Sequence, residues 1–96
     1  MIRHVSLLQF TPDSTDAQLD EIMRDLATLP DRLRFESYAF GRDLEINEGN
    51  YDIAVVADFA TVDDYLAYRD DPEHQRVIAE LIRPILASRV AVQYEV

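Results

Sequence analysis

Hydrophobic and polar residues alternate in four segments of the chain, and a repeat of two residues is typical of β-strands. The alternation covers residues 2–11, 35–41, 51–59 and 89–96. The first segment ends at Pro12, and a polar loop over residues 42–50, rich in turn formers, separates the second segment from the third. The sequence therefore predicts four strands.

Between the strands, apolar residues recur at spacings of three and four, which predicts amphipathic helices. The first helix begins with a capping box at residues 15–18 and ends at Pro30. The second begins at Thr61 and is interrupted at residues 71–72, where an aspartate suited to an N-cap precedes a proline suited to the first helical position. A new helix starts there, and we expect Pro84 to kink or loosen its end. The predicted buried residues of this helix are Val77, Ile78, Leu81, Ile82, Ile85 and Leu86.

The order of these elements is the βαββαβ pattern of ferredoxin-like α+β folds, in which both helices cover one face of an antiparallel four-stranded sheet. The chain has 96 residues, of which 48% are hydrophobic and 29% are charged. This size and composition are typical of one compact domain, which we expect to cover residues 1–96.

Apolar residues are predicted on both faces of the sheet, although the helices can cover only one. We assign to the uncovered face Val5, Leu7, Ile53, Val55, Phe59, Val90, Val92 and Tyr94. An apolar patch of this size does not stay exposed on a soluble monomer, and so small a domain gains stability from pairing. The sequence therefore predicts a homodimer formed through this sheet face, with isologous symmetry.

The predicted residues of the covered face are small or polar, namely His4, Ser6, Asp52, Ala54 and Ala91. Such residues leave space beneath the helices, so we expect them to line a pocket with titratable groups that binds a small apolar ligand. Asp52 needs a partner there, because an unpaired buried carboxylate is costly. A hydrogen bond to His4 would provide that partner.

Charge and composition exclude several classes of function. The 9 cationic residues, all arginine, face 19 Asp and Glu, which gives a net charge of −10 and no basic cluster for nucleic acid. There is no cysteine, the two histidines lack metal-ligand spacing, and there is no phosphate loop or dinucleotide fingerprint, so we expect no metal. No segment has the ~20 apolar residues of a membrane span or the pattern of a signal peptide, which predicts a cytoplasmic protein.

His74 and Tyr68 are the candidate catalytic residues. A helix N-terminus favours a neutral imidazole at His74, whereas three neighbouring carboxylates favour the protonated ring, so the direction of its pKa shift stays open. The helix break at residues 71–72 can bring Tyr68 beside His74, where a phenol donates to a developing oxyanion while an imidazole removes a proton. The alternative is structural: His74 is then a surface residue, His4 a core residue, and Tyr68 packs its helix on the sheet.

Four segments of the chain resemble the stress-responsive A/B barrel (Dabb) domain family, namely MIRHVSLLQF, EGNYDIAVVADF, YLAYRDDPEHQRVIAELIRPIL and VAVQYEV. The most specific pieces are the histidine of the first strand, the Gly-Asn-Tyr-Asp entry to the third strand and the Pro-x-His at the helix break. The resemblance extends over nearly the whole chain. It implies a dimeric α+β barrel in which two four-stranded sheets close face to face.

One plant member of this family is an aldol cyclase that acts on a linear tetraketide thioester. By resemblance, His74 would be the general base for an acidic C–H between two carbonyls, and Tyr68 would stabilise the enolate oxygen. His4 and Asp52 would orient the substrate, and no cofactor would be required. Asp52 stands where that plant enzyme has a further pocket histidine, and this departure argues against an identical substrate.

The resemblance therefore favours a small-molecule-binding dimer that works as a cofactor-free, polyketide cyclase-like enzyme of the aldol type. Two alternatives stay open. One is a non-catalytic stress-response or ligand-binding dimer, and the other is a cofactor-free monooxygenase of the antibiotic-biosynthesis type, which shares the fold but not these segments.

Overall fold

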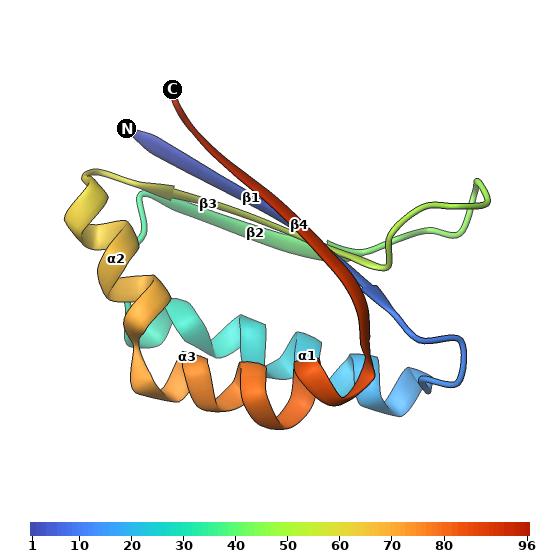
Figure 1. Cartoon of the computed structure of the whole chain (residues 1–96). Helices are drawn as coiled ribbons and strands as arrows, with labels where there is room; N and C mark the ends of the chain where they lie inside the picture. Colours follow the sequence, from blue (N-terminus) through green and yellow to red (C-terminus); the bar gives the residue numbers. More distant parts are fainter.

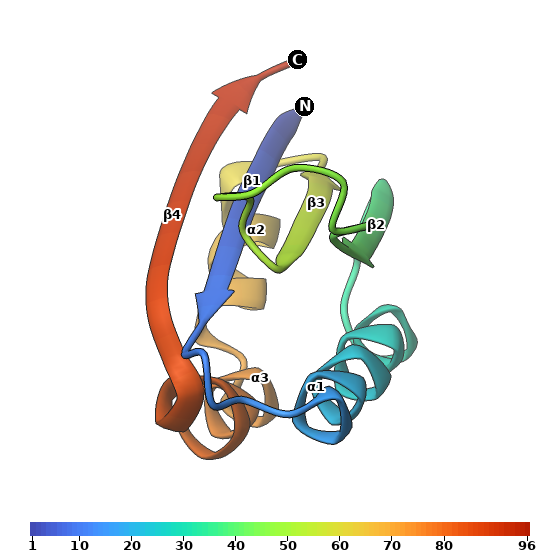
Figure 2. The same cartoon turned by 90° about the vertical axis from the view of Figure 1, so that its right-hand side faces the viewer.

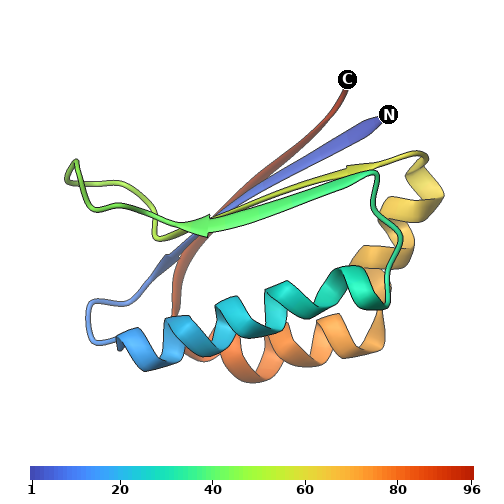
Figure 3. The same cartoon turned by 180° about the vertical axis from the view of Figure 1, so that it is seen from behind.

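The computed structural model describes all 96 residues and has the predicted architecture, an antiparallel four-stranded sheet with the helices on one face (Figure 1). The strands are β1 (Ile2–Phe10), β2 (Ser37–Arg42), β3 (Ile53–Phe59) and β4 (Leu86–Glu95), in the spatial order β2-β3-β1-β4. The α-helices are α1 (Asp16–Thr28), α2 (Val62–Asp70) and α3 (Pro72–Val77). All three lie on the same side of the sheet, as the view from behind also shows (Figure 3), so the ferredoxin-like prediction is confirmed.

All three predicted helix starts are capped by side chains, and at the start of α2 the Thr61 hydroxyl accepts the backbone N–H of Asp64 at 3.1 Å. The Thr15 hydroxyl accepts the backbone N–H of Gln18 at 3.2 Å, and the Thr15 N–H donates to Gln18 Oε1 at 2.8 Å. The predicted capping box is therefore present. At the break between α2 and α3, the Asp71 carboxylate accepts the backbone N–H of His74 at 2.8 Å, and Pro72 takes the first position of α3.

The helix that starts at Pro72 changes its hydrogen bonding before it ends. α3 is followed by a π-helical turn (Ile78–Ile82) and a 3-10 turn (Arg83–Ile85). Pro84 lies in that last turn, and it has no N–H to donate to the carbonyl one helical turn earlier, so the prediction that it loosens the end is confirmed. β4 begins at Leu86 rather than at residue 89, because β1 pairs with it as far as Phe10.

The pairing of β1 with β3 decides which side of β3 faces the helices. Directly opposed residues share a face, and Leu8 lies opposite Ile53. Ile53, Val55 and Phe59 are buried on the helix side, so their predicted placement on the uncovered face is wrong. Ala54 lies on the uncovered face instead. Alternation shows which residues share a face, but only the register with a neighbouring strand decides which face that is.

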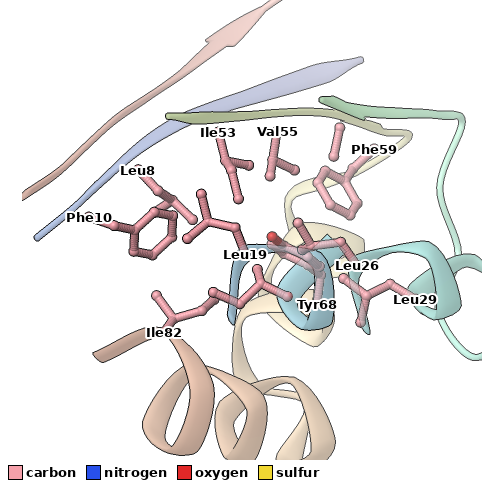
Figure 4. Close-up of a cluster of buried hydrophobic side chains, with 12 residues drawn as sticks. Leu8, Phe10, Leu19, Leu26, Leu29, Ile53, Val55, Phe59, Tyr68 and Ile82 are labelled. Atoms are coloured by element: carbon pink, nitrogen blue, oxygen red, sulfur yellow. The ribbon is translucent and has the colours of Figure 1, made fainter. Parts of the chain in front are cut away.

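The hydrophobic core lies between the helix side of the sheet and the helices (Figure 4). Phe59 of β3 and Ile22 of α1 are fully buried in it. None of the helices has the length and apolar character needed to cross a membrane. The twelve core residues are Leu8, Phe10, Leu19, Ile22, Leu26, Leu29, Ile53, Val55, Ala57, Phe59, Tyr68 and Ile82.

The uncovered face carries an apolar strip along β1 and β4. Val5 lies opposite Val92, and Leu7 lies opposite Val90. Val90, Val92 and Tyr94 are 46%, 54% and 46% exposed. The predicted placement of these five residues is confirmed, and they leave an apolar surface that the protein's own helices do not cover.

One partly buried ion pair lies beside this strip. The Arg3 guanidinium donates from Nε and Nη2 to the two carboxylate oxygens of Asp58, at 2.8 and 2.9 Å, and the Ser37 hydroxyl donates to the same carboxylate at 2.8 Å. These bonds from Arg3 and Ser37 lower the pKa of Asp58 to about 2. The carboxylate therefore stays ionised at neutral pH and links β1 to both β3 and β2.

Candidate functional site

A cavity of about 340 Å³ lies between the helix side of β1 and β4 and the helices α2 and α3. Figure 2 shows these elements around one half of the molecule, with β4 at the sheet edge. Such a volume is at the lower end of the range for small-molecule sites. The apolar lining consists of Leu8, Leu26, Val55, Ile78, Ile82 and Leu86, and the polar lining of His4, Ser6, Tyr65, Tyr68, Arg69, His74, Gln75, Arg83 and Arg89.

The helix break at Asp71 and Pro72 brings Tyr68 and His74 together. Their ring centroids are 4.6 Å apart with an interplanar angle of 33°. A continuous helix would not place residues six apart side by side. The predicted contact is present because α3 starts in a new direction after α2 ends (Figure 1).

The polar atoms of both side chains are accessible to solvent, and both residues line the cavity. His74 is held by its backbone N–H, which donates to Asp71, and its ring nitrogens make no hydrogen bond within the protein. The Tyr68 hydroxyl also has no hydrogen-bond partner within the protein. Every fully buried side-chain nitrogen or oxygen does have such a partner, so the Tyr68 hydroxyl and the His74 ring nitrogens are not fully buried. Both groups therefore retain access to the space where a ligand would lie.

Burial shifts the pKa values of these two groups in opposite directions. Burial lowers the pKa of His74 more strongly than the Asp71 carboxylate raises it, which decides the direction that the sequence left open. Burial raises the pKa of Tyr68 to about 12. At neutral pH the site therefore holds a neutral imidazole, able to accept a proton, beside a protonated phenol, able to donate a hydrogen bond.

His4 lies next to the same pair but is held differently. Its ring centroid is 5.3 Å from that of Tyr65 and 5.7 Å from that of Tyr68. The Gln93 side-chain nitrogen lies 2.7 Å from His4 Nδ1. An amide nitrogen only donates, so Nδ1 accepts and the neutral ring carries its proton on Nε2. Burial lowers the pKa of His4 to about 4, which keeps this ring neutral.

The predicted hydrogen bond between Asp52 and His4 is wrong. Asp52 Oδ2 accepts the backbone N–H of Phe10 at 2.7 Å, and the Asp52 N–H donates to the carbonyl of Leu8 at 2.8 Å. His4 lies opposite Ala57, five residues further along the chain, so the two are separated by about 16 Å along the sheet at ~3.3 Å per residue. Asp52 thus connects the residue before β3 to the C-terminal end of β1 by hydrogen bonds, and it does not line the cavity.

The remaining predicted pocket residues divide between the two faces. Ser6 lines the cavity from β1. Ala91 lies opposite Ser6 on the same face but is exposed and does not reach the cavity. Ala54 and Asp52 line a separate depression near the loop that precedes β3. Of the seven predicted site residues, the structure therefore brings four together, which are His4, Ser6, Tyr68 and His74.

Sequence reasoning missed several residues of the site. Gln93 and Arg89 lie on the helix side of β4 because their neighbours in β1 are His4 and Leu8. Both lie two positions from Ala91 and therefore on the same face of the strand, so the alternation along β4 could have identified them. Tyr65 also lines the cavity and was not among the predicted site residues.

The family model described as "Stress responsive A/B Barrel Domain" matches residues 2–96. A crystal structure from Thermobifida fusca, described as a dimeric ferredoxin-like protein of unknown function, is 42% identical, with a TM-score of 0.89 over 99% of this chain and 90% of that chain. The hydroxynitrile lyase of Passiflora edulis is 20% identical, with a TM-score of 0.82 over 99% and 92% of the two chains. An antibiotic biosynthesis monooxygenase is 12% identical, with a TM-score of 0.80 over 100% and 98%. No curated protein matches the sequence.

Proposed function

Since the chain belongs to the stress-responsive A/B barrel domain family, we propose that it is a homodimeric enzyme that performs cofactor-free acid–base chemistry at a carbonyl compound. The reaction best suited to the site is an aldol-type step of the kind that a polyketide cyclase performs. One observation carries the proposal: the neutral imidazole of His74 and the protonated phenol of Tyr68 lie side by side, and both residues line the cavity.

In this mechanism His74 is the general base. It removes a proton from a C–H between two carbonyls, and the electron pair moves onto a carbonyl oxygen to give an enolate. The Tyr68 hydroxyl donates a hydrogen bond to that oxygen, where the negative charge develops. The enolate carbon then forms a bond with a second carbonyl carbon of the same substrate, and the new alkoxide takes the proton back from the His74 imidazolium.

His4 is assigned to substrate orientation. Its Nε2–H is directed by the Gln93 hydrogen bond on the other ring nitrogen, and it offers a second donor next to Tyr68. Because its pKa is about 4 and its Nδ1 already accepts from Gln93, this ring serves as a neutral donor. Ser6 adds a hydroxyl on the same strand face.

The second candidate function is ligand binding without chemistry. Tyr68 is only 7% exposed and belongs to the hydrophobic core cluster, so packing alone gives it a role. Aliphatic side chains form much of the cavity lining, which suits a small apolar ligand.

We place the dimer interface on the uncovered sheet face, with isologous symmetry. The strip consists of half-buried Val5 and Leu7 and exposed Val90, Val92 and Tyr94, and it lies on the far side of the sheet from the cavity. Packing two such faces together removes the apolar surface from water and leaves both cavities accessible. The protein from Thermobifida fusca, which is 42% identical, is described as dimeric, which supports this assembly.

Proton abstraction is testable without the natural substrate. The probe is the N-acetylcysteamine thioester of 3-oxohexanoic acid in deuterated buffer, and NMR measures loss of the C2 proton signal. We expect the protein to accelerate this exchange above the buffer rate. His74→Ala should lower the acceleration by roughly 100-fold or more, and Tyr68→Phe by roughly 100-fold.

Tyr51→Phe is the matched control, because it also removes a phenol hydroxyl, but one that bonds to Ser88 outside the cavity. It should exchange the probe at the unmodified rate. If the unmodified protein binds the thioester, as shifts of its cavity resonances would show, but leaves the exchange rate at background, the enzyme proposal is wrong and the ligand-binding function stands.

A further inference from the structure

The charge around the cavity is opposite to the charge of the chain. The protein has a net charge of −10, with 19 acidic and 9 basic residues. Three arginines line the cavity, Arg69, Arg83 and Arg89, and no aspartate or glutamate does. All three arginines are exposed, whereas His4, Tyr68 and His74 are buried, so the positive charge is at the open side of the cavity.

Two of these arginines have no carboxylate partner, although carboxylates outnumber cations. Arg69 pairs with Asp70, and four arginines away from the cavity also form ion pairs. Arg83 and Arg89 form none with any Asp or Glu of the chain. Their donors therefore remain available to an acceptor that enters the cavity.

The charge of Arg89 acts on the interior of the site. Arg89 extends from the helix side of β4, opposite Leu8. Its positive charge contributes to the lowered pKa values of His4 and His74, and it opposes the rise in the pKa of Tyr68. All three polar groups of the site thus lie within range of this guanidinium.

We propose that the cavity binds an anionic ligand, with a carboxylate or phosphate group held by Arg83 and Arg89 and an apolar body packed along Ile78 and Ile82. Arginine suits this role because its planar donor fork matches both groups, and no carboxylate lines the cavity to compete for the two guanidinium groups. The inference rests on the cavity being the ligand site of the proposed function, and it specifies the class of molecule that enters.

This arrangement orients the ligand. Ile78 and Ile82 belong to the π-helical turn that follows His74 and precedes Arg83 in the chain, and both line the cavity. A ligand anchored by its anion at the rim extends its other end toward Tyr68 and His74. For the proposed chemistry, the anchor would fix which carbonyl of the substrate reaches the base.

The test compares three probes with the same apolar body: 4-phenylbutanoate, 4-phenylbutyl phosphate and the neutral 4-phenylbutanamide. Dissociation constants are measured by NMR titration at low ionic strength, following the cavity resonances. We expect the carboxylate or the phosphate to bind at least about tenfold more tightly than the amide, and the comparison of these two shows which anion the site prefers. Added salt should weaken anion binding and leave amide binding unchanged.

Arg89→Gln and Arg83→Gln should each remove most of this preference. Arg24→Gln is the matched control, because Arg24 is also exposed and unpaired but lies on α1 away from the cavity. It should behave like the unmodified protein.

The proposal is overturned if the amide binds as tightly as the anions, if no probe shifts the cavity resonances, or if the Arg24 variant loses as much affinity as the Arg89 variant. Equal binding of all probes would still leave the proposed acid–base function to be decided by the thioester exchange assay, so the two failures are distinguishable.

Discussion

The lowered pKa of His4 makes the stability of this protein sensitive to mild acid. A folded-state pKa of about 4, against 6.5 for a free ring, means that protonation is disfavoured in the folded protein. The unfolded chain takes up the proton as the pH falls below about 6.5, whereas the folded protein does not until the pH approaches 4. The stability due to the neutral ring is therefore complete above pH 6.5 and is lost as the pH falls.

The size of the effect follows from the shift. One pKa unit corresponds to about 1.4 kcal/mol, so at pH 5 the one and a half units between that pH and 6.5 amount to a loss of about 2 kcal/mol. Since the ring borders a solvent-accessible cavity, we expect about 1 to 2 kcal/mol. Asp and Glu with ordinary pKa values remain mostly ionised at pH 5, so this interval isolates the histidines.

The comparison is between the unmodified protein and His4→Gln, in which the glutamine retains a hydrogen-bonding group for Gln93. Urea unfolding at pH 7 and pH 5, at one fixed protein concentration, gives the free energy of unfolding of each. The unmodified protein should lose about 1 to 2 kcal/mol more than the variant over this interval, because His74 contributes equally to both. Equal losses, or a larger loss in the variant, would refute the assignment of His4 as a buried neutral ring.

Two further predictions concern the interface and the helix break. Val92→Glu places a charge in the uncovered apolar strip and should convert the dimer to a monomer in analytical ultracentrifugation. Ala27→Glu, on the exposed side of α1, is the control and should leave the dimer unchanged. A Val92 variant that remains dimeric would exclude this face as the interface. Asp71→Ala removes the N-cap that positions His74 and should cost about 1 kcal/mol of stability together with part of the thioester exchange activity. An unchanged exchange rate in a folded Asp71 variant would show that the cap does not position the base.

The sequence by itself determined the elements whose causes are local. A capping box depends on residues three positions apart, and so does the N-cap of α3, so both could be located before any tertiary contact was known. The proximity of Tyr68 and His74 was predictable for the same reason, because a break between two neighbouring helices brings them together. The repeats of two and of three to four residues were sufficient for the order of strands and helices.

Tertiary structure decided every feature that depends on strand register. The sequence shows the alternation in β3, but both faces of that strand carry apolar residues. The face that packs against the helices could therefore not be identified from the sequence. Pairing with β1 reversed the choice, which buried Ile53 and Val55 and removed Asp52 and Ala54 from the cavity. A shift of one residue exchanges the faces of a strand, so no local pattern contains this information.

Contacts between strands that are distant in the sequence also decided which polar residues surround the site. Gln93 reaches His4, which is 89 positions away in the sequence, and Arg89 reaches the cavity only because β4 returns beside β1. Burial also decided the protonation of His74, where the helix N-terminus and the nearby carboxylates oppose each other in the sequence. Short-range patterns fix local conformation, whereas contacts between distant segments set burial, register and charge, and these are the quantities on which the chemistry of the cavity depends.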